Sequence, residues 1–145
     1  MGFAGRDELV AALNALIEAE RAGTRVAKAW GKATTGSAGA LLATVQADEA
    51  QWCAMLSAHV RRLGGAPSRK TGGFLARALA IGDGGSRLAF LNKGQGWVVR
   101  ALDTLTPRVR DEGLHADLKR MRDAHLANIA AAHALIAQDQ PPPSA

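Results

Sequence analysis

The sequence predicts an all-α protein in which four long helices form two hairpins joined by one long connection. Three observations lead to this prediction. Alanine and leucine are the two most frequent residues and aromatic residues make up only 4% of the chain, which is typical of packed helices. Apolar residues recur at alternating steps of three and four along four long segments, as on one face of a helix. The connection between the second and third segments is far longer than the other two.

The first two segments form the first predicted hairpin. The first helix is expected over residues 7–33. Its apolar face consists of Leu9, Leu13, Leu16 and Ile17. The sequence Thr-Thr-Gly-Ser at residues 34–37 predicts a tight turn, and the second helix is expected over residues 38–63. Two consecutive glycines, Gly64 and Gly65, follow it, which is a common signal for the end of a helix.

The other two segments form the second predicted hairpin. The third helix is expected over residues 86–105 and the fourth over residues 114–138, with a short link that contains a helical turn after Pro107. Within the long connection that precedes them, a short helix is expected at residues 74–80.

The length and the composition limit the class of protein. A chain of 145 residues has the size of one domain, so residues 1–138 are predicted to form a single domain and residues 139–145, which are rich in proline, a disordered tail. The single cysteine, Cys53, excludes an internal disulfide and an all-cysteine metal site. The N-terminus lacks the apolar run of a signal peptide, and no stretch has the length of a membrane span. A cytoplasmic protein without a membrane partner is therefore predicted.

The net charge of +5 permits an acidic partner but does not argue for one, because the basic residues are spread along the chain. The densest basic group surrounds the end of the second helix and the long connection. Its members are Arg61, Arg62, Arg69, Lys70 and Arg77. No aromatic residues are interleaved with them, so a solvated face is favoured over a nucleic-acid site.

Each long helix carries one polar residue near its middle, at a position where the apolar spacing predicts a core residue. These residues are Glu20, Glu49, Gln95 and His125. In the second helix, for example, Glu49 stands between Val45 and Trp52. A buried carboxylate without a partner costs several kcal/mol or gives up its charge, so such a residue needs an explanation.

The four polar residues also share a level along the helices. Glu20 lies 15 residues before the first turn, near residue 35, and Glu49 lies 14 residues after it. Gln95 and His125 each lie 15 residues from the second turn, near residue 110. At a rise of 1.5 Å per residue, all four are about 22 Å from their turns. We therefore expect them to meet in one layer of the core, with the neighbouring Trp52 packed beside them.

A simpler interpretation stands beside this one. Polar residues also occur at the rim of helix interfaces, where a glutamate is exposed or forms a salt bridge. Arg21, Arg100 and Arg122 are available as partners.

Two glycines, Gly94 and Gly96, flank Gln95 inside the third helix, where each glycine costs about 1 kcal/mol relative to alanine. They are interpreted either as making room for the Trp52 indole or a small ligand, or as easing helix packing.

Four stretches of the chain resemble the helices of rubrerythrin-like and other ferritin-like proteins. They are LNALIEAERAG (13–23), DEAQWCAMLSAHVRRLGGAPS (48–68), GQGWVVRALDTL (94–105) and MRDAHLANI (121–129). The resemblance covers residues 7–138 and implies a ferritin-like four-helix bundle in an uncharacterised, divergent branch of that superfamily.

In that superfamily, two metal ions are held by a Glu on each of two helices and a Glu-x-x-His pair on each of the other two. This sequence matches the pattern in part. Glu20 stands at the first Glu, Glu49 is followed by Trp52 instead of His, Gln95 replaces a Glu, and His125 is preceded by Arg122 instead of Glu. Three of the six ligand positions are kept, so the resemblance implies at most one transition metal ion (Fe, Mn or Zn), with Glu20, Glu49, Gln95 and His125 as its ligands, or a polar core without metal. In the second case, the Arg122 guanidinium is expected to take the place of the metal.

We therefore predict a binding or structural protein, acting as a homodimer and not binding nucleic acid, with a degenerate carboxylate and histidine site. Two alternatives stay open. One is a metal-dependent oxidoreductase of the di-iron type in which Asp48 or Asp123 supplies substitute ligands. The other is a basic helical module that binds nucleic acid or a protein partner. The sequence leaves open whether the protein is an enzyme.

Overall fold

A computed structural model of the protein describes residues 2–138, and over this range it contains helices and no strands. The helices are α1 (Arg6–Gly31), α2 (Gly36–Arg62), α3 (Phe74–Leu79), α4 (Gly84–Leu105) and α5 (Glu112–Gln138), with a 3-10 turn at Thr106–Arg108. The all-α prediction is confirmed, and every predicted helix bound lies within two residues of the observed one. The predicted disordered tail, residues 139–145, lies outside the described residues.

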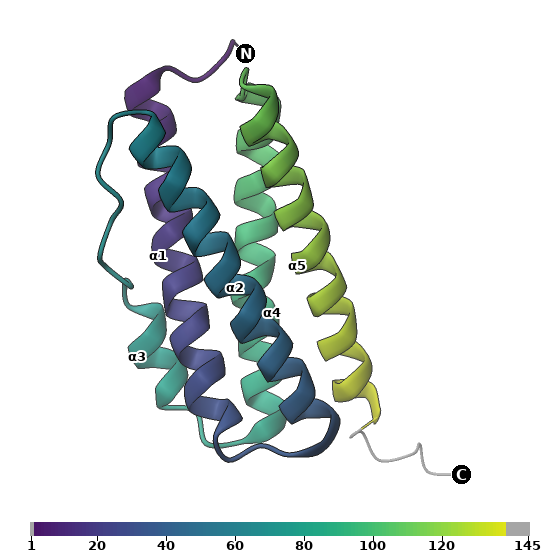
Figure 1. The fold of residues 1–145 in the computed structure, drawn as a ribbon. Coiled ribbons are helices and arrows are strands. Elements are labelled where there is room, and N and C mark those ends of the chain that lie inside the picture. Colours follow the sequence, from purple (N-terminus) through teal and green to yellow (C-terminus); the bar gives the residue numbers. More distant parts are fainter. Residues whose placement is uncertain (1, 139–145) are drawn as a thin grey trace.

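The four long helices lie side by side, and the short helix α3 lies outside them against α1 (Figure 1). Helix α1 packs mainly on α2 and α4 mainly on α5, as expected for two hairpins, while contacts of α2 with α5 and of α1 with α4 join the pairs. The first turn is tight: Gly36 has a φ of +67°, which favours glycine. In the link between α4 and α5, the helical turn expected after Pro107 is the 3-10 turn. Asp111 Oδ1 then caps α5 by accepting a hydrogen bond from the Leu114 amide at 2.8 Å.

The buried apolar side chains form two clusters, one in each half of the helices. In α1, Leu16 and Ile17 belong to the first cluster, whereas Val26 and Ala27 belong to the second. Glu20, which is also buried, lies between them in the sequence. In each of the other long helices a buried polar residue likewise lies between residues of the two clusters, so a polar layer separates two apolar halves of the core.

The long connection runs back along α1 and is attached to it by polar contacts. Asn14 donates from Nδ2 to the Ala66 carbonyl at 3.2 Å and accepts from the Ser68 amide at 2.8 Å. Further along, Arg21 donates to the Lys70 carbonyl at 3.0 Å. These contacts bring α3 against α1 and α4.

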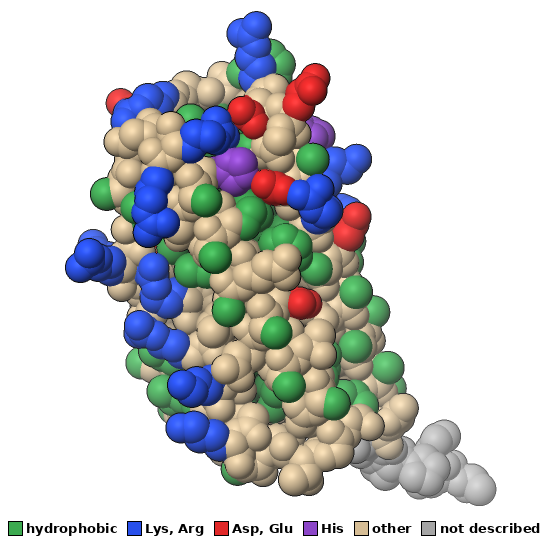
Figure 2. Space-filling view, in the orientation of Figure 1, with side chains coloured by type: hydrophobic (Ala, Val, Ile, Leu, Met, Phe, Trp, Pro, Cys, Tyr) green, Lys and Arg blue, Asp and Glu red, His purple; other side chains and the backbone are tan. Residues whose placement is uncertain are grey.

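On the face shown in Figure 2, many of the basic side chains follow one edge, and others lie at the top and near the opposite edge. Figure 2 shows Lys and Arg side chains spread from one end of this edge to the other, with apolar and uncharged atoms over the centre of the face. Among residues 2–138, no helix combines the length and the apolar character that crossing a membrane requires.

Candidate metal centre

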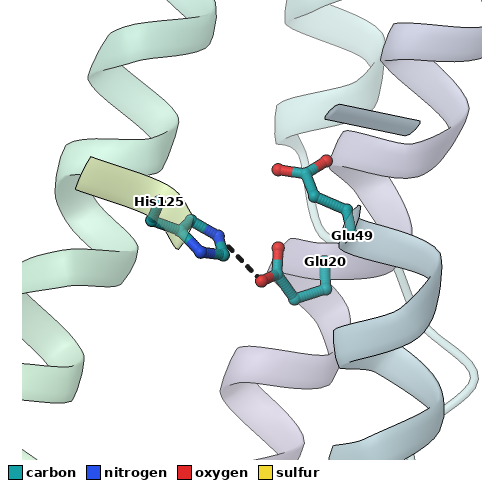
Figure 3. A group of neighbouring side chains, drawn as sticks. All are labelled: Glu20, Glu49 and His125. Atoms are coloured by element: carbon teal, nitrogen blue, oxygen red, sulfur yellow. Dashed lines mark ion pairs between the residues drawn. The ribbon is translucent and has the colours of Figure 1, made fainter. Parts of the chain in front are cut away.

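Three of the predicted polar residues meet in the centre of the core. Glu20 comes from α1, Glu49 from α2 and His125 from α5, and their side chains point toward one another (Figure 3). One potential ligand atom from each residue lies within 4.8 Å of the others. The exposed fractions of the three residues are 0%, 3% and 1%, so the group is shielded from solvent. The level predicted from the sequence thus holds for these three residues, which lie together and could hold a metal ion.

The position of Glu49 depends on a glycine of the neighbouring helix. A Cβ atom built on Gly23 would lie 2.0 Å from Glu49 Oε2, far inside van der Waals contact. The carboxylate therefore occupies space that a side chain on α1 would fill. Gly23 was not among the predicted site residues, although a glycine one turn after Glu20 in the interior of a helix, at a cost of about 1 kcal/mol, is a usable signal.

The ring of His125 is oriented by its own helix. Nδ1 lies 2.8 Å from the carbonyl oxygen of Met121. Because a carbonyl oxygen only accepts hydrogen bonds, Nδ1 carries the hydrogen, and in the neutral ring the lone pair is on Nε2. Nε2 lies 2.8 Å from Glu20 Oε1. This is the arrangement of a metal-binding histidine, whose second nitrogen is fixed by a backbone carbonyl.

The polar atoms at the centre of the group are unsatisfied. Both oxygens of Glu20, Oε2 of Glu49 and Nε2 of His125 are buried, and none of them has a hydrogen-bond partner of acceptable geometry among residues 2–138. The 2.8 Å contact between Glu20 and His125 has the distance of an ion pair without hydrogen-bond alignment. A lone pair facing a carboxylate oxygen is repulsive unless a proton or a metal cation lies between them.

The titration of the three groups reflects this environment. Burial raises the pKa of Glu20, against the lowering effect of His125. Burial also raises the pKa of Glu49 well above its ordinary value, and the charges of Glu20 and Asp48 add to this effect. Burial alone would lower the pKa of His125, but its contacts with Glu20 and with the Met121 carbonyl outweigh burial and raise it. Without a metal cation the group therefore tends to hold protons, which a bound cation would displace.

Two further predicted residues are buried nearby. Gln95 is 2% exposed, and neither atom of its amide has a partner among the described residues. It lines a cleft of about 390 Å³ that also reaches Glu49. Its role as a fourth metal ligand stays a prediction. Trp52, one turn after Glu49, is buried in the first apolar cluster.

The structure corrects the prediction for Arg122. Its side chain is 40% exposed, and its Nε donates to Asp103 Oδ1 of α4 at 2.5 Å. The guanidinium thus lies on the surface and does not take the place of a metal between the two glutamates. A partner at the surface allows Arg122 to stay hydrated, which avoids the desolvation penalty of a buried charge.

The proposed substitute ligands are also placed elsewhere. Asp123 is 76% exposed and has Arg122 as its neighbour at 4.0 Å, so it is not a ligand of the buried group. Asp48 accepts a hydrogen bond from Asn128 at 3.0 Å and acts on the three residues through its charge.

The interpretation of the third-helix glycines also changes. A Cβ on Gly94 would lie 2.8 Å from the ring of Phe74, so this glycine makes room for α3 and not for Trp52. A Cβ on Gly96 would meet only the end of the Arg100 side chain, at 3.3 Å.

The chain belongs to a family described as "Domain of unknown function (DUF6306)", whose model matches residues 7–134. Comparison with the curated proteins and with the solved structures found no match.

Proposed function

We propose that this protein is a ferritin-like four-helix bundle that binds one divalent transition metal ion through Glu20, Glu49 and His125. One observation supports the proposal most strongly. Potential ligand atoms from three helices lie within 4.8 Å of one another in a buried place where, apart from the 2.8 Å contact between Glu20 and His125, they lack polar partners among the described residues. Small side-chain movements would bring these atoms to the ~2.0–2.2 Å that metal–oxygen and metal–nitrogen bonds require.

The charge of the group fits one metal ion and not two. Two carboxylates balance the charge of one divalent cation, and the imidazole adds a neutral ligand. A dinuclear site of the ferritin-like type uses six protein ligands, four of them carboxylates. Here Trp52 lies in an apolar cluster and Arg122 lies at the surface, so these two ligand positions offer nothing to a second ion.

The mixed oxygen and nitrogen ligands suit Fe, Mn or Zn. A metal ion held by three protein ligands keeps coordination positions open, and in such a site it supplies Lewis-acid chemistry to a bound water or ligand. The protein contributes the orientation: the Met121 carbonyl fixes the ring of His125, and Gly23 leaves the space that Glu49 fills.

The proposal is tested by metal titration of protein stripped with chelator. We expect one equivalent of Mn(II) or Zn(II) to bind per chain by calorimetry and elemental analysis. With Co(II), the visible absorption should stop increasing at one equivalent per chain. The substitutions Glu20→Gln and His125→Gln should each weaken binding by more than about 100-fold, because they remove a ligand rather than an outer-shell partner. The matched controls Glu18→Gln and His133→Gln, at positions outside the buried group, should bind like the unmodified protein. No binding, or two equivalents per chain, would contradict the proposal.

A further inference from the structure

A second feature is the cleft that reaches Glu49, whose lining does not include Glu20 or His125 but shares Glu49 with the proposed metal site. It lies between α1, α4 and the segment that contains α3, and its volume of about 390 Å³ is at the lower end of the ~300–1,000 Å³ range of small-molecule sites. Its walls are largely apolar and include the rings of Phe74, Phe90 and Trp97. Phe74 and Phe90 are stacked, with ring centroids 4.9 Å apart. The lining therefore suits a small ligand with an apolar body.

The buried wall of the cleft carries an unsatisfied amide. Gln95 lines the cleft, is 2% exposed and has no partner for either its Nε2 or its Oε1 among the described residues. A buried amide without partners destabilises a fold, and leucine at this position would pack without that penalty. The unsatisfied donor and acceptor are thus available to a polar group on a ligand.

The rim of the cleft has an excess of positive charge. Arg77 of α3 and Lys93 and Arg100 of α4 line it, and all three are exposed. The lining contains two carboxylates: Glu18 of α1, which is half-buried and lies toward the rim, and Glu49, which is buried. Three cations against one carboxylate favour an anionic group at the rim.

We infer that the cleft binds a small organic monoanion with an aromatic or branched apolar body. Its anionic group lies among the rim cations, its body packs on Phe74, Phe90 and Trp97, and a hydrogen-bonding group at its inner end meets the Gln95 amide. This inference goes beyond the proposed metal site. Glu49 is common to both, but the ligand contacts argued here are those of Gln95, the aromatic rings and the rim cations, which the metal-free protein already presents.

The inference is tested with 3-(4-hydroxyphenyl)propanoate as the probe and chelator-treated full-length protein. Binding is followed by calorimetry and by fluorescence, since Trp97 lines the cleft and is 46% exposed, whereas Trp30 and Trp52 are buried elsewhere. Two matched compounds separate the parts of the ligand. The alcohol 3-(4-hydroxyphenyl)propan-1-ol lacks the charge and should bind about tenfold more weakly. The acid 3-phenylpropanoate lacks the inner hydroxyl and should bind about two- to tenfold more weakly.

Protein variants test the same assignments. Gln95→Leu should weaken binding of the hydroxy acid about tenfold while its melting temperature is unchanged or higher, which a purely structural role of the amide would not produce. Lys93→Gln should weaken binding about two- to fivefold, and Glu18→Gln should strengthen it by a similar factor. Lys119→Gln, on the exposed side of α5, is the control and should change nothing.

Three results would overturn the inference. The first is equal affinity for the acid and the alcohol, which would indicate a site for neutral apolar molecules. The second is unchanged binding in Gln95→Leu, and the third is no binding of any of the compounds at millimolar concentration. Each of these leaves the metal titration unaffected, so failure here is distinguishable from failure of the metal site.

Discussion

The fit of Glu49 against Gly23 leads to a prediction about the sign of a glycine-to-alanine substitution. In a helix interior, replacing glycine by alanine normally stabilises a protein by about 0.5–1 kcal/mol. In Gly23→Ala, the new methyl group would lie 2.0 Å from Glu49 Oε2, whereas ordinary contacts begin near 3.4 Å, so the carboxylate must move by about 1.4 Å. Overpacking of this kind costs about 1–3 kcal/mol. We therefore expect Gly23→Ala to destabilise the metal-free protein by about 1–2 kcal/mol and to abolish metal binding.

The matched control is Gly96→Ala in α4. Its methyl group would meet only the end of the exposed Arg100 side chain, at 3.3 Å, so the usual stabilisation of about 0.5–1 kcal/mol is expected. Urea unfolding of both variants measures the two effects. In a Glu49→Ala variant the carboxylate is absent, so adding Gly23→Ala should stabilise that variant by about as much as Gly96→Ala stabilises the unmodified protein. If Gly23→Ala instead stabilises the unmodified protein and retains its metal, the placement of Glu49 against α1 is wrong.

Four further predictions concern the surface. Arg122→Ala should change the free energy of unfolding by less than about 0.5 kcal/mol in urea titrations, because its partner Asp103 is also at the surface; a loss above about 2 kcal/mol would show a buried role. The Leu114 amide lowers the pKa of Asp111 from 3.8, so its contribution to stability is present above that value and is lost as pH falls through the lower folded pKa. Asp111→Asn keeps a capping side chain without the charge, and its urea midpoint should fall less between pH 5 and pH 3. Finally, size-exclusion chromatography should show the predicted homodimer, and a DNA-binding titration at low salt should show no salt-dependent complex.

Much of the fold could be predicted because it follows from local periodicity. Steps of three and four located the four long helices, and the glycines at 64 and 65 and the link at Pro107 located two of the helix ends. The same periodicity identified Glu20, Glu49 and His125, since a polar residue on an apolar stripe must face the core of a protein made of packed helices.

The rest depended on contacts that periodicity does not encode. Arg122 lies three residues before His125, about 60° around the helix from it, and a long side chain at that angle reaches either the core or the surface. The exposed Asp103 on α4 decides between them. Likewise, Gly94 was predicted to make room for Trp52, but the ring beside it is that of Phe74. Phe74 belongs to a segment whose position relative to α4 is set by tertiary packing.

The placement of Glu49 lowers stability in two helices at once. In α2, a carboxylate stands in the layer between two apolar clusters, where burial raises its pKa well above the ordinary value. In α1, Gly23 replaces a better helix former so that this carboxylate fits. Neither loss is recovered by a hydrogen bond to Oε2 among the described residues. A bound cation would recover both, because its binding energy contributes to folding. A polar core without metal would leave both losses of stability uncompensated. For this reason the geometry around Glu49 favours metal binding over a purely structural role.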